Sequence, residues 1–163
     1  MQIKITKSKA KDIEGIAKIG SENFSGLSDL KYARKWIMCN FSAFPRTQYF
    51  VAKGPKGPPG KISGYILWIE KGGFRKQAVF ELEQIAVAKD FQGQGIGTQL
   101  IEESLLEIKK YLKKRGSILK AVEVTTGTDN KAQGLYKKTL GAEIECVVKN
   151  LFRGDEVIMI ARF

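Results

Sequence analysis

The chain contains no histidine, and its 163 residues include only two cysteines, Cys39 and Cys146. These two cysteines are far apart, and no CxxC pair is present. Nucleophilic triads of the Ser-His or Cys-His type need an imidazole, and structural zinc sites need clusters of cysteine or histidine. We therefore expect no metal site, no disulfide framework and no histidine-dependent nucleophile.

Long apolar runs are also lacking. No stretch approaches the ~20 apolar residues that a membrane helix needs, and the opening segment MQIKITKSKAKD has no apolar core of a secretory signal. We therefore expect a cytoplasmic protein with no membrane partner. A chain of this length with 43% hydrophobic residues can bury one good core, which predicts a single domain over residues 1–163.

Negative charge is in short supply, because 28 lysines and arginines face 17 aspartates and glutamates and leave a formal net charge of +11. Such an excess is compatible with a nucleic acid, an anionic cofactor, an acidic partner or a lysine-rich solvated surface. The basic residues are spread along the chain, without an arginine-rich run interleaved with aromatic residues. We therefore do not expect nucleic acid as a partner.

Hydrophobic periodicity predicts that strands and helices alternate along the chain. The predicted strands are 2–6, 49–52, 62–69, 80–87, 118–125, 142–150 and 156–162, and the predicted helices are 11–24, 28–41, a long helix from Ile96 to a stop at Gly116, and 131–139. The Gly- and Pro-rich segment 54–61 is predicted to be a surface connection between the second and third strands. This order predicts the α/β class, with helices packed on a mixed sheet.

The segment Gln92–Gly97 stands between a predicted strand and the long helix, and it holds three glycines. Backbone amides freed by glycine, together with the positive end of a helix, can hold phosphate oxygens. A tight turn that needs glycine only for its backbone angles explains the same residues. The dinucleotide-binding fingerprint is not met, because Thr98 stands where its third glycine belongs, and no lysine follows as in a P-loop.

Residues 85–87 (Ile-Ala-Val), followed by residues 91–97 (Phe-Gln-Gly-Gln-Gly-Ile-Gly), resemble the acetyl-coenzyme A signature of the GNAT N-acetyltransferase superfamily, Gln/Arg-x-x-Gly-x-Gly/Ala after a strand. The order of elements is similar to that family over nearly the whole chain. Leu135-Tyr136 and Leu140-Gly141 resemble its second conserved helix and the end of that helix. The resemblance implies a mixed, mostly antiparallel central sheet flanked by helices, with acetyl-coenzyme A as cosubstrate.

The same resemblance assigns roles to the backbone around the glycine loop. It implies that the last residues of the preceding strand pair with the pantetheine arm as an added strand would, while loop amides hold the pyrophosphate. The coenzyme-binding residues expected on this basis are Ile85, Ala86, Val87, Gln92, Gly93, Gln94, Gly95, Ile96, Gly97, Thr98 and Asn130. Apolar filling of a central strand is compatible with this role for Ile85 and Val87.

Acetyl transfer to an amine needs a base for the ammonium proton, and three glutamates are candidates. The period of two in a strand places Glu81 and Glu83 on one face, and Glu123 lies on another strand. Glu81, four residues before Ile85, resembles the base position of histone-type family members. Glu123 resembles that of bacterial ribosomal-protein N-terminal acetyltransferases. A glutamate on a solvent-facing strand surface is the alternative for each.

Tyr136 is the candidate general acid, since a phenol with a pKa near ~10 stays protonated at neutral pH. The family pattern is Asn-x-x-Ala-x-x-x-Tyr-x-x-x-Gly, whereas here Gly141 follows Tyr136 by five residues. An ungapped alignment from Asn130 would place Lys137 at the tyrosine position. Small length changes in the flanking loops would restore Tyr136 and place Asp129 where the family has Asn. A core or surface tyrosine is the alternative.

The sequence thus predicts an N-acetyltransferase that moves acetyl from acetyl-coenzyme A to a primary amine by direct attack on the thioester. The acceptor is left open between a peptide or protein N-terminus and a small-molecule amine, although residues 150–159 resemble N-terminal peptide acetyltransferases. A coenzyme-binding sensor or interaction module without turnover is the competing prediction. A homodimer is the default expectation for the oligomeric state.

Overall fold

The computed structural model describes residues 3–54 and 61–163. The chain divides into two compact units, of which the first comprises Met1–Trp68 and Gln84–Ser104 and the second Ile69–Glu83 and Leu105–Phe163. Most of the predicted connection 54–61 lies outside the described residues.

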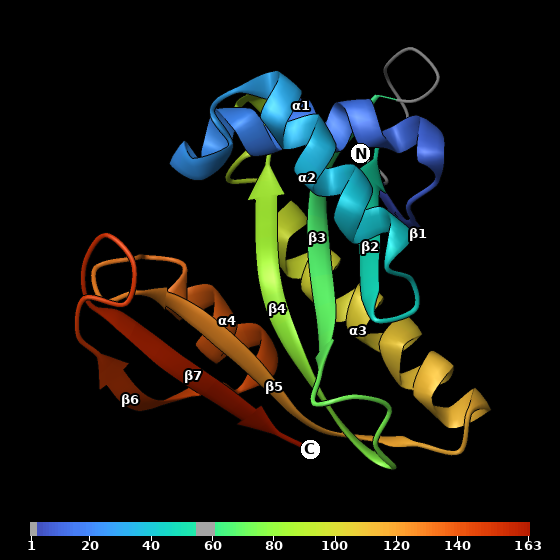
Figure 1. Ribbon diagram of the computed structural model, residues 1–163, viewed down its shortest axis with the longest axis vertical. Helices are drawn as coiled ribbons and strands as arrows, with labels where there is room; N and C mark the ends of the chain where they lie inside the picture. The colour runs from blue at the N-terminus through green and yellow to red at the C-terminus, as the bar shows by residue number, and fades with distance from the viewer. Residues whose placement is uncertain (1–2, 55–60) are drawn as a thin grey trace. The chain divides into compact units, whose positions relative to one another are not determined.

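Within the described residues, hydrogen bonds join seven strands in the order β1-β2-β3-β4-β5-β7-β6 (Figure 1). The strands are β1 (Lys4–Lys7), β2 (Thr47–Lys53), β3 (Ile62–Lys71), β4 (Gln77–Val87), β5 (Ile118–Gly127), β6 (Glu143–Val148) and β7 (Glu156–Arg162). Strands β4 and β5 are parallel, whereas β1–β2, β5–β7 and β6–β7 are antiparallel. The sheet is mixed and mostly antiparallel, which confirms the predicted α/β class.

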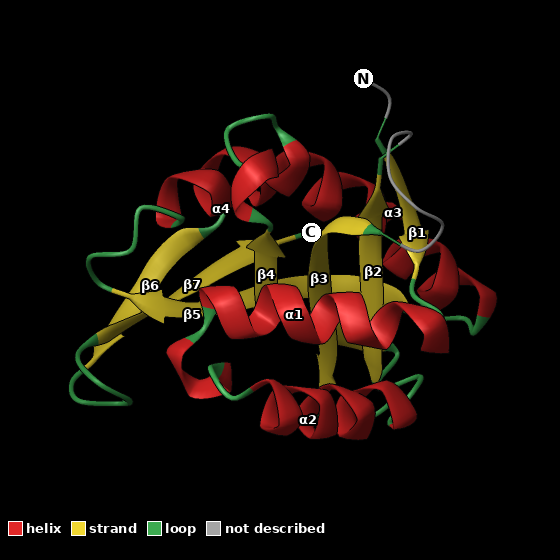
Figure 2. Ribbon diagram, turned by 90° about the horizontal axis from the view of Figure 1, so that it is seen from above, coloured by secondary structure: helices red, strands yellow, loops and turns green. Residues whose placement is uncertain are grey.

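The first unit packs helices against β2 and β3. Figure 2 shows α1 (Ile13–Asn23) and α2 (Leu30–Ser42) on one side of these strands, and α3 (Ile96–Lys114) begins on the other side. The side chain of Asp29 caps α2 by accepting a hydrogen bond from the Tyr32 amide at 2.7 Å. The indole of the fully buried Trp68 donates to Ser104 Oγ at 2.7 Å, which ties β3 to the first half of α3.

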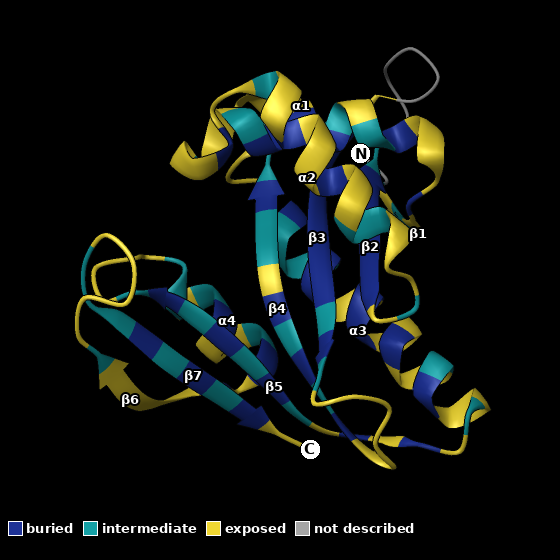
Figure 3. Cartoon of the chain, viewed as in Figure 1, coloured by how far each residue is buried: buried dark blue, intermediate teal, exposed yellow. Residues whose placement is uncertain are grey.

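The second unit combines the start of β4 with β5, β7 and β6, the end of α3 and the short helix α4 (Gln133–Leu140). Burial alternates along β4, β5 and β7, whereas β6 is mostly exposed (Figure 3). On β4, Ala78, Phe80 and Leu82 are buried, and the intervening residues Val79 and Glu81 are less so. The predicted period of two is confirmed, and it leaves the face with the carboxylates less deeply buried.

The predicted helices are all present, with differences at their ends. The first two helices were predicted to begin two residues before they do. A 3-10 turn over Ala10–Asp12 precedes α1, and the Asp29 cap fixes the start of α2. The last begins at Gln133, because the Asn130 side chain accepts a hydrogen bond from the Ala132 amide at 2.9 Å and holds a turn there. No helix in the described part of the chain is long and apolar enough to cross a membrane.

Candidate active site

The glycine loop lies in the first unit, between β4 and α3. Gly93 and Gly95 have φ angles of 74° and 77°, in the left-handed region that favours glycine. A Cβ added to either would meet nothing within 4 Å, so the loop needs these glycines for their backbone angles and not for room. The same open space lets a ligand approach the backbone at both positions.

The loop side chains turn back on their own backbone. The amide group of Gln92 donates to the carbonyl of Val87 at 3.0 Å, and that of Gln94 donates to the carbonyl of Asp90 at 3.2 Å. The first α-helical hydrogen bond runs from the Gln99 amide to the Gly95 carbonyl at 3.1 Å. The amides of residues 96–98 therefore precede that bond, at the positive end of a helix of 19 residues, and they fit a pyrophosphate.

The segment Ile85–Val87 ends β4 in the same unit, as the sequence predicts. Ala86 is 5% exposed, and Ile85 and Val87 are partly buried. Gly64 of β3 lies against this segment, because a Cβ there would come within 2.9 Å of the Ala86 carbonyl oxygen. The sequence analysis did not single out Gly64, whose role depends on how closely the two strands approach.

The candidate bases lie in the second unit, and two of them are brought together. Glu81 of β4 and Glu123 of β5 are partners in the parallel register. Both carboxylates contact Nζ of Lys71, at 3.2 Å from Glu81 and 2.8 Å from Glu123. Burial acts to lower the pKa of Lys71, but hydrogen bonds to Glu123 and Glu81 outweigh it and leave that pKa raised.

Glu83 stands two residues beyond Glu81 on the same face of β4. Burial of its carboxyl raises the pKa of Glu83, and the neighbouring carboxylate of Glu81 raises it further by its charge and by accepting a hydrogen bond. The positive charge of Lys71 acts in the opposite direction. Although the residue remains exposed, the pKa of Glu83 is thus raised toward the range in which a general base works.

Tyr136 lies on α4 with 5% of its surface exposed, and burial raises the pKa of its phenol. Its hydroxyl has no hydrogen-bond partner among the residues that the structure describes. The Asn130 side chain is engaged locally, since its Nδ2 donates to Thr126 Oγ1 at 2.8 Å and its Oδ1 caps the turn before α4. Asn130 therefore shapes the connection between β5 and α4.

The predicted residues divide between the two units. The residues of β4 and of the glycine loop expected to hold the coenzyme lie in the first, whereas Asn130, the three glutamates and Tyr136 lie in the second. Lys71 is an addition that the sequence analysis missed, because a lysine at the end of a strand carries no local signal. Both cysteines are free and exposed, and no cluster of His, Cys, Asp or Glu in residues 3–54 and 61–163 could hold a metal ion.

Solved structures share this fold. The chain aligns with a structure of the NatC complex bound to Gag peptide and coenzyme A with a TM-score of 0.73 and 15% identity, covering 100% of this chain and 99% of that one. It aligns with the spermidine/spermine N-acetyltransferase of Vibrio cholerae with a TM-score of 0.69 and 18% identity, covering 98% and 93%. At these identities the likeness shows the fold alone.

Sequence comparisons identify the family. An uncharacterised N-acetyltransferase of Methanocaldococcus jannaschii is 35% identical over 126 residues, which are 76% of this chain. The chain spans about half the length of that relative, since the match covers 50% of it. The model of the acetyltransferase (GNAT) family matches residues 14–142. The chain therefore belongs to the GNAT family of acetyltransferases.

Proposed function

We propose that this chain is an N-acetyltransferase that moves the acetyl group of acetyl-coenzyme A to the terminal amine of a peptide. The observation that carries the proposal is the cluster of Glu81, Glu83 and Glu123 around Lys71, in which one carboxyl has a raised pKa. A general base works best when its pKa approaches the working pH, because it is then both ionised and basic enough to accept a proton.

Acetyl-coenzyme A supplies the thioester whose acetyl group is transferred. The amides of residues 96–98 bind and orient its pyrophosphate, since they point from the start of α3 without α-helical partners. The loop leaves backbone exposed at Gly93 and Gly95, and there the left-handed angles require glycine.

Glu83 is our first candidate for the base. Glu81 and Glu123 are both ion-paired with the ammonium of Lys71. The raised pKa of Glu83 suits its carboxylate to accept the proton of the acceptor's ammonium. Glu81 and Glu123 remain candidates on the family resemblance. The amine then attacks the thioester carbonyl, a C–N bond forms and the C–S bond breaks.

Tyr136 is the proposed acid for the departing thiolate. Its raised pKa keeps the phenol protonated through neutral pH, and its hydroxyl is not committed to any other residue that the structure describes. One proton thus moves from the ammonium to a glutamate before the attack, and another from the phenol to sulfur as the C–S bond breaks. The second proton that nitrogen loses as the amide forms restores the phenol.

Net charge favours a peptide over a polyamine as the acceptor. Of the two solved structures compared above, one is a complex bound to a peptide and the other is a spermidine/spermine N-acetyltransferase. A formal net charge of +11 repels polyamines and does not repel neutral or acidic peptides. We therefore place the peptide amine ahead of the polyamine.

The test is thiol release from acetyl-coenzyme A with purified protein over a panel of short peptides and small amines. We expect release with peptides, and a loss in kcat of about 10²- to 10⁴-fold for Glu83→Gln. Glu81→Gln and Glu123→Gln run beside it, and Glu103→Gln, an exposed change on α3, serves as the control. Tight coenzyme binding with no thiol release on any acceptor would favour the sensor and contradict the proposal.

A further inference from the structure

A hollow of about 580 Å³ lies in the second unit, beside the candidate bases. Its charged lining comprises Lys71, Arg75, Lys76, Lys120 and Glu123, and Val79 of β4 forms part of its floor. We call this feature the basic hollow. Four cations and one carboxylate give it a positive field, and Lys71 is already compensated by Glu81 and Glu123.

The other three cations of the basic hollow are uncommitted. Arg75, Lys76 and Lys120 are all exposed. Arg75 Nε donates to the Gly72 carbonyl at 2.8 Å, but none of the three makes an ion pair with any described residue. Their charges are therefore free to bind an anion that enters the hollow.

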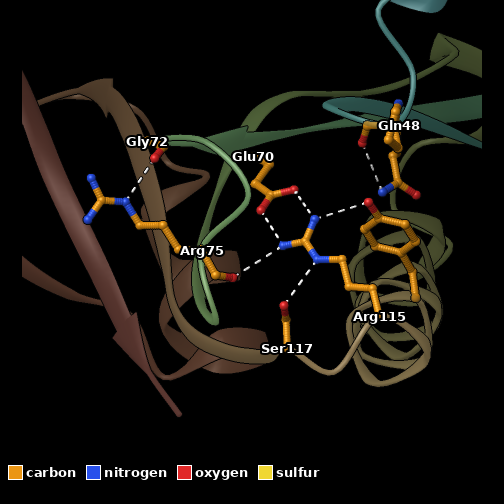
Figure 4. A network of polar contacts seen from close by, with 8 residues as sticks. Gln48, Glu70, Gly72, Arg75, Arg115 and Ser117 are labelled. Atoms are coloured by element: carbon orange, nitrogen blue, oxygen red, sulfur yellow. Dashed lines mark hydrogen bonds and ion pairs between the residues drawn. The ribbon is translucent and has the colours of Figure 1, made fainter.

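The wall of the basic hollow is held in place. Arg115 Nη2 donates to the carbonyl of Arg75 at 3.4 Å, and the same guanidinium binds Glu70 through two hydrogen bonds of 2.9 and 2.5 Å (Figure 4). The amide of Ile118 donates to the Lys76 carbonyl at 2.9 Å, which ties the turn to the start of β5. Arg75 and Lys76 thus project from a braced turn, and Lys120 projects from β5, which limits the backbone ordering needed on binding.

The position of the basic hollow relates it to the proposed base. On the shared face of β4, Val79 precedes Glu81 by two residues, a distance of about 7 Å along a strand. Gln77, which pairs with Ile118, lies about 7 Å further from Glu81. An extended peptide with its amine at the carboxylates would therefore place its third to fifth residues beside Val79 and Gln77, and long basic side chains there can reach the residue before. That span is longer than a free amino acid.

We propose that the basic hollow selects acceptor peptides that carry Asp or Glu just after the terminal amine. This inference rests on the proposed function and adds the substrate class. Arg75, Lys76 and Lys120 bind the side-chain carboxylates, so that the amine of an acidic peptide is held at the candidate bases. A neutral or lysine-containing peptide gains no such contact, and the latter is repelled.

The experiment compares three peptides with the same first residue, followed by Asp-Glu, by Asn-Gln or by Lys-Lys. We expect the highest kcat/KM for the Asp-Glu peptide, and the Lys-Lys peptide to be the poorest acceptor. Fluorescence anisotropy of the same labelled peptides, with coenzyme A present, measures binding independently of turnover. Raising the salt concentration from 50 to 500 mM should reduce the differences in kcat/KM and in affinity among the three peptides, because exposed charges are screened.

Substitutions of Lys76 and Lys120 test the assignment directly. Lys76→Gln and Lys120→Gln should each lower the acidic-to-amide ratio by about two- to fivefold, in turnover and in binding alike. Lys120→Glu should lower it further and improve the Lys-Lys peptide. Lys113→Gln removes one exposed charge from α3 in the same unit and should leave the ratio unchanged.

The outcomes separate the two proposals. Thiol release with equal kcat/KM on all three peptides would overturn the role of the basic hollow in selecting acidic peptides. So would an acidic-to-amide ratio that Lys76→Gln and Lys120→Gln do not change. Either result would leave the proposed acetyltransferase activity intact. Preferential binding of the acidic peptide without thiol release would support the hollow and contradict the enzyme. If a single-stranded oligonucleotide displaces the labelled acidic peptide at a lower concentration than the unlabelled peptide does, the hollow binds phosphate. That result would also overturn the proposed preference for acidic peptides.

Discussion

Glu81 and Glu123 face each other across the parallel strands β4 and β5, and both carboxylates contact the ammonium of Lys71, at 3.2 and 2.8 Å. A single lysine does not neutralise two carboxylates, so the group keeps an excess of negative charge. That excess acts on Glu83, whose pKa is raised by burial and by Glu81. Glu81 thus adds to the effect of burial on the proton affinity of Glu83.

Lys71→Met tests this relationship. The positive charge of Lys71 lowers the pKa of Glu83, so its removal should raise that pKa further. If Glu83 is the base, the acidic limb of the kcat/KM profile should move to higher pH, since the base must be ionised to act. The profile of a Lys113→Met control on α3 should match the unmodified protein. An acidic limb that stays in place in Lys71→Met would separate Glu83 from the proton transfer.

Tyr136→Phe should lower kcat by about 10²- to 10³-fold, because the thiolate loses its proton donor. The change keeps the ring in its buried place and removes a hydroxyl that bonds to no described residue, so the thermal midpoint should hardly move. The raised pKa of Tyr136 places the alkaline limb of the profile above that of an ordinary phenol, and the variant should lose that limb. Unchanged kcat in the folded variant would show that Tyr136 is a core residue only.

The fold was predictable because its signals are local. The alternation along β4 and the helical spacing of buried apolar residues along α3 both involve residues close in sequence, and the glycine loop between them carries its own signature. The first residues of α1 and α4 were less predictable. A 3-10 turn precedes α1, and a hydrogen bond to the Asn130 side chain holds a turn before α4. Such competition between turn and helix is decided by single hydrogen bonds.

The ranking of the glutamates was not predictable from sequence, because it depends on contacts between distant strands. Lys71 ends β3, Glu81 is mid-β4 and Glu123 is on β5, and only the register brings them to one point. The basic hollow depends on the same register and on the brace at Arg115. A pattern of residue types along the chain fixes neither distance.

Gly95→Ala should weaken binding of coenzyme A and lower stability. The φ of 77° costs about 1–2 kcal/mol for a residue with a Cβ, and no clash contributes, since the added carbon meets nothing within 4 Å. If the backbone relaxes to escape that strain, the amides at the start of α3 move, and we expect the Kd for coenzyme A to rise about tenfold. Titration calorimetry checks the affinity.

Gly26→Ala is the control for Gly95→Ala. Gly26 has equally open surroundings but lies in a 3-10 turn, outside the left-handed region. Its replacement should change neither stability nor coenzyme affinity. Equal effects of the two substitutions would show that the left-handed angle at Gly95 does not shape the coenzyme loop.

Arg115→Met should be the most destabilising of these changes. The carboxylate of Glu70 is 1% exposed and receives two hydrogen bonds from Arg115, so the variant leaves a buried charge without its partner. Loss of one member of a buried pair costs about 3 kcal/mol, read from urea denaturation. The turn that bears Arg75 should loosen as well, and the acidic-peptide preference should fall with it.

A second variant separates the charge from the packing. In Glu70→Leu combined with Arg115→Met, no buried charge is left, so the double variant should recover much of the stability that Arg115→Met loses. Arg34→Met, which breaks the exposed pair with Glu14, should barely shift the urea midpoint, because both of its side chains are well solvated. If the double variant is instead no more stable than Arg115→Met, the unpaired carboxylate of Glu70 is not the source of the loss, and the cation–π contacts of Arg115 with Phe74 and Tyr111 account for it instead.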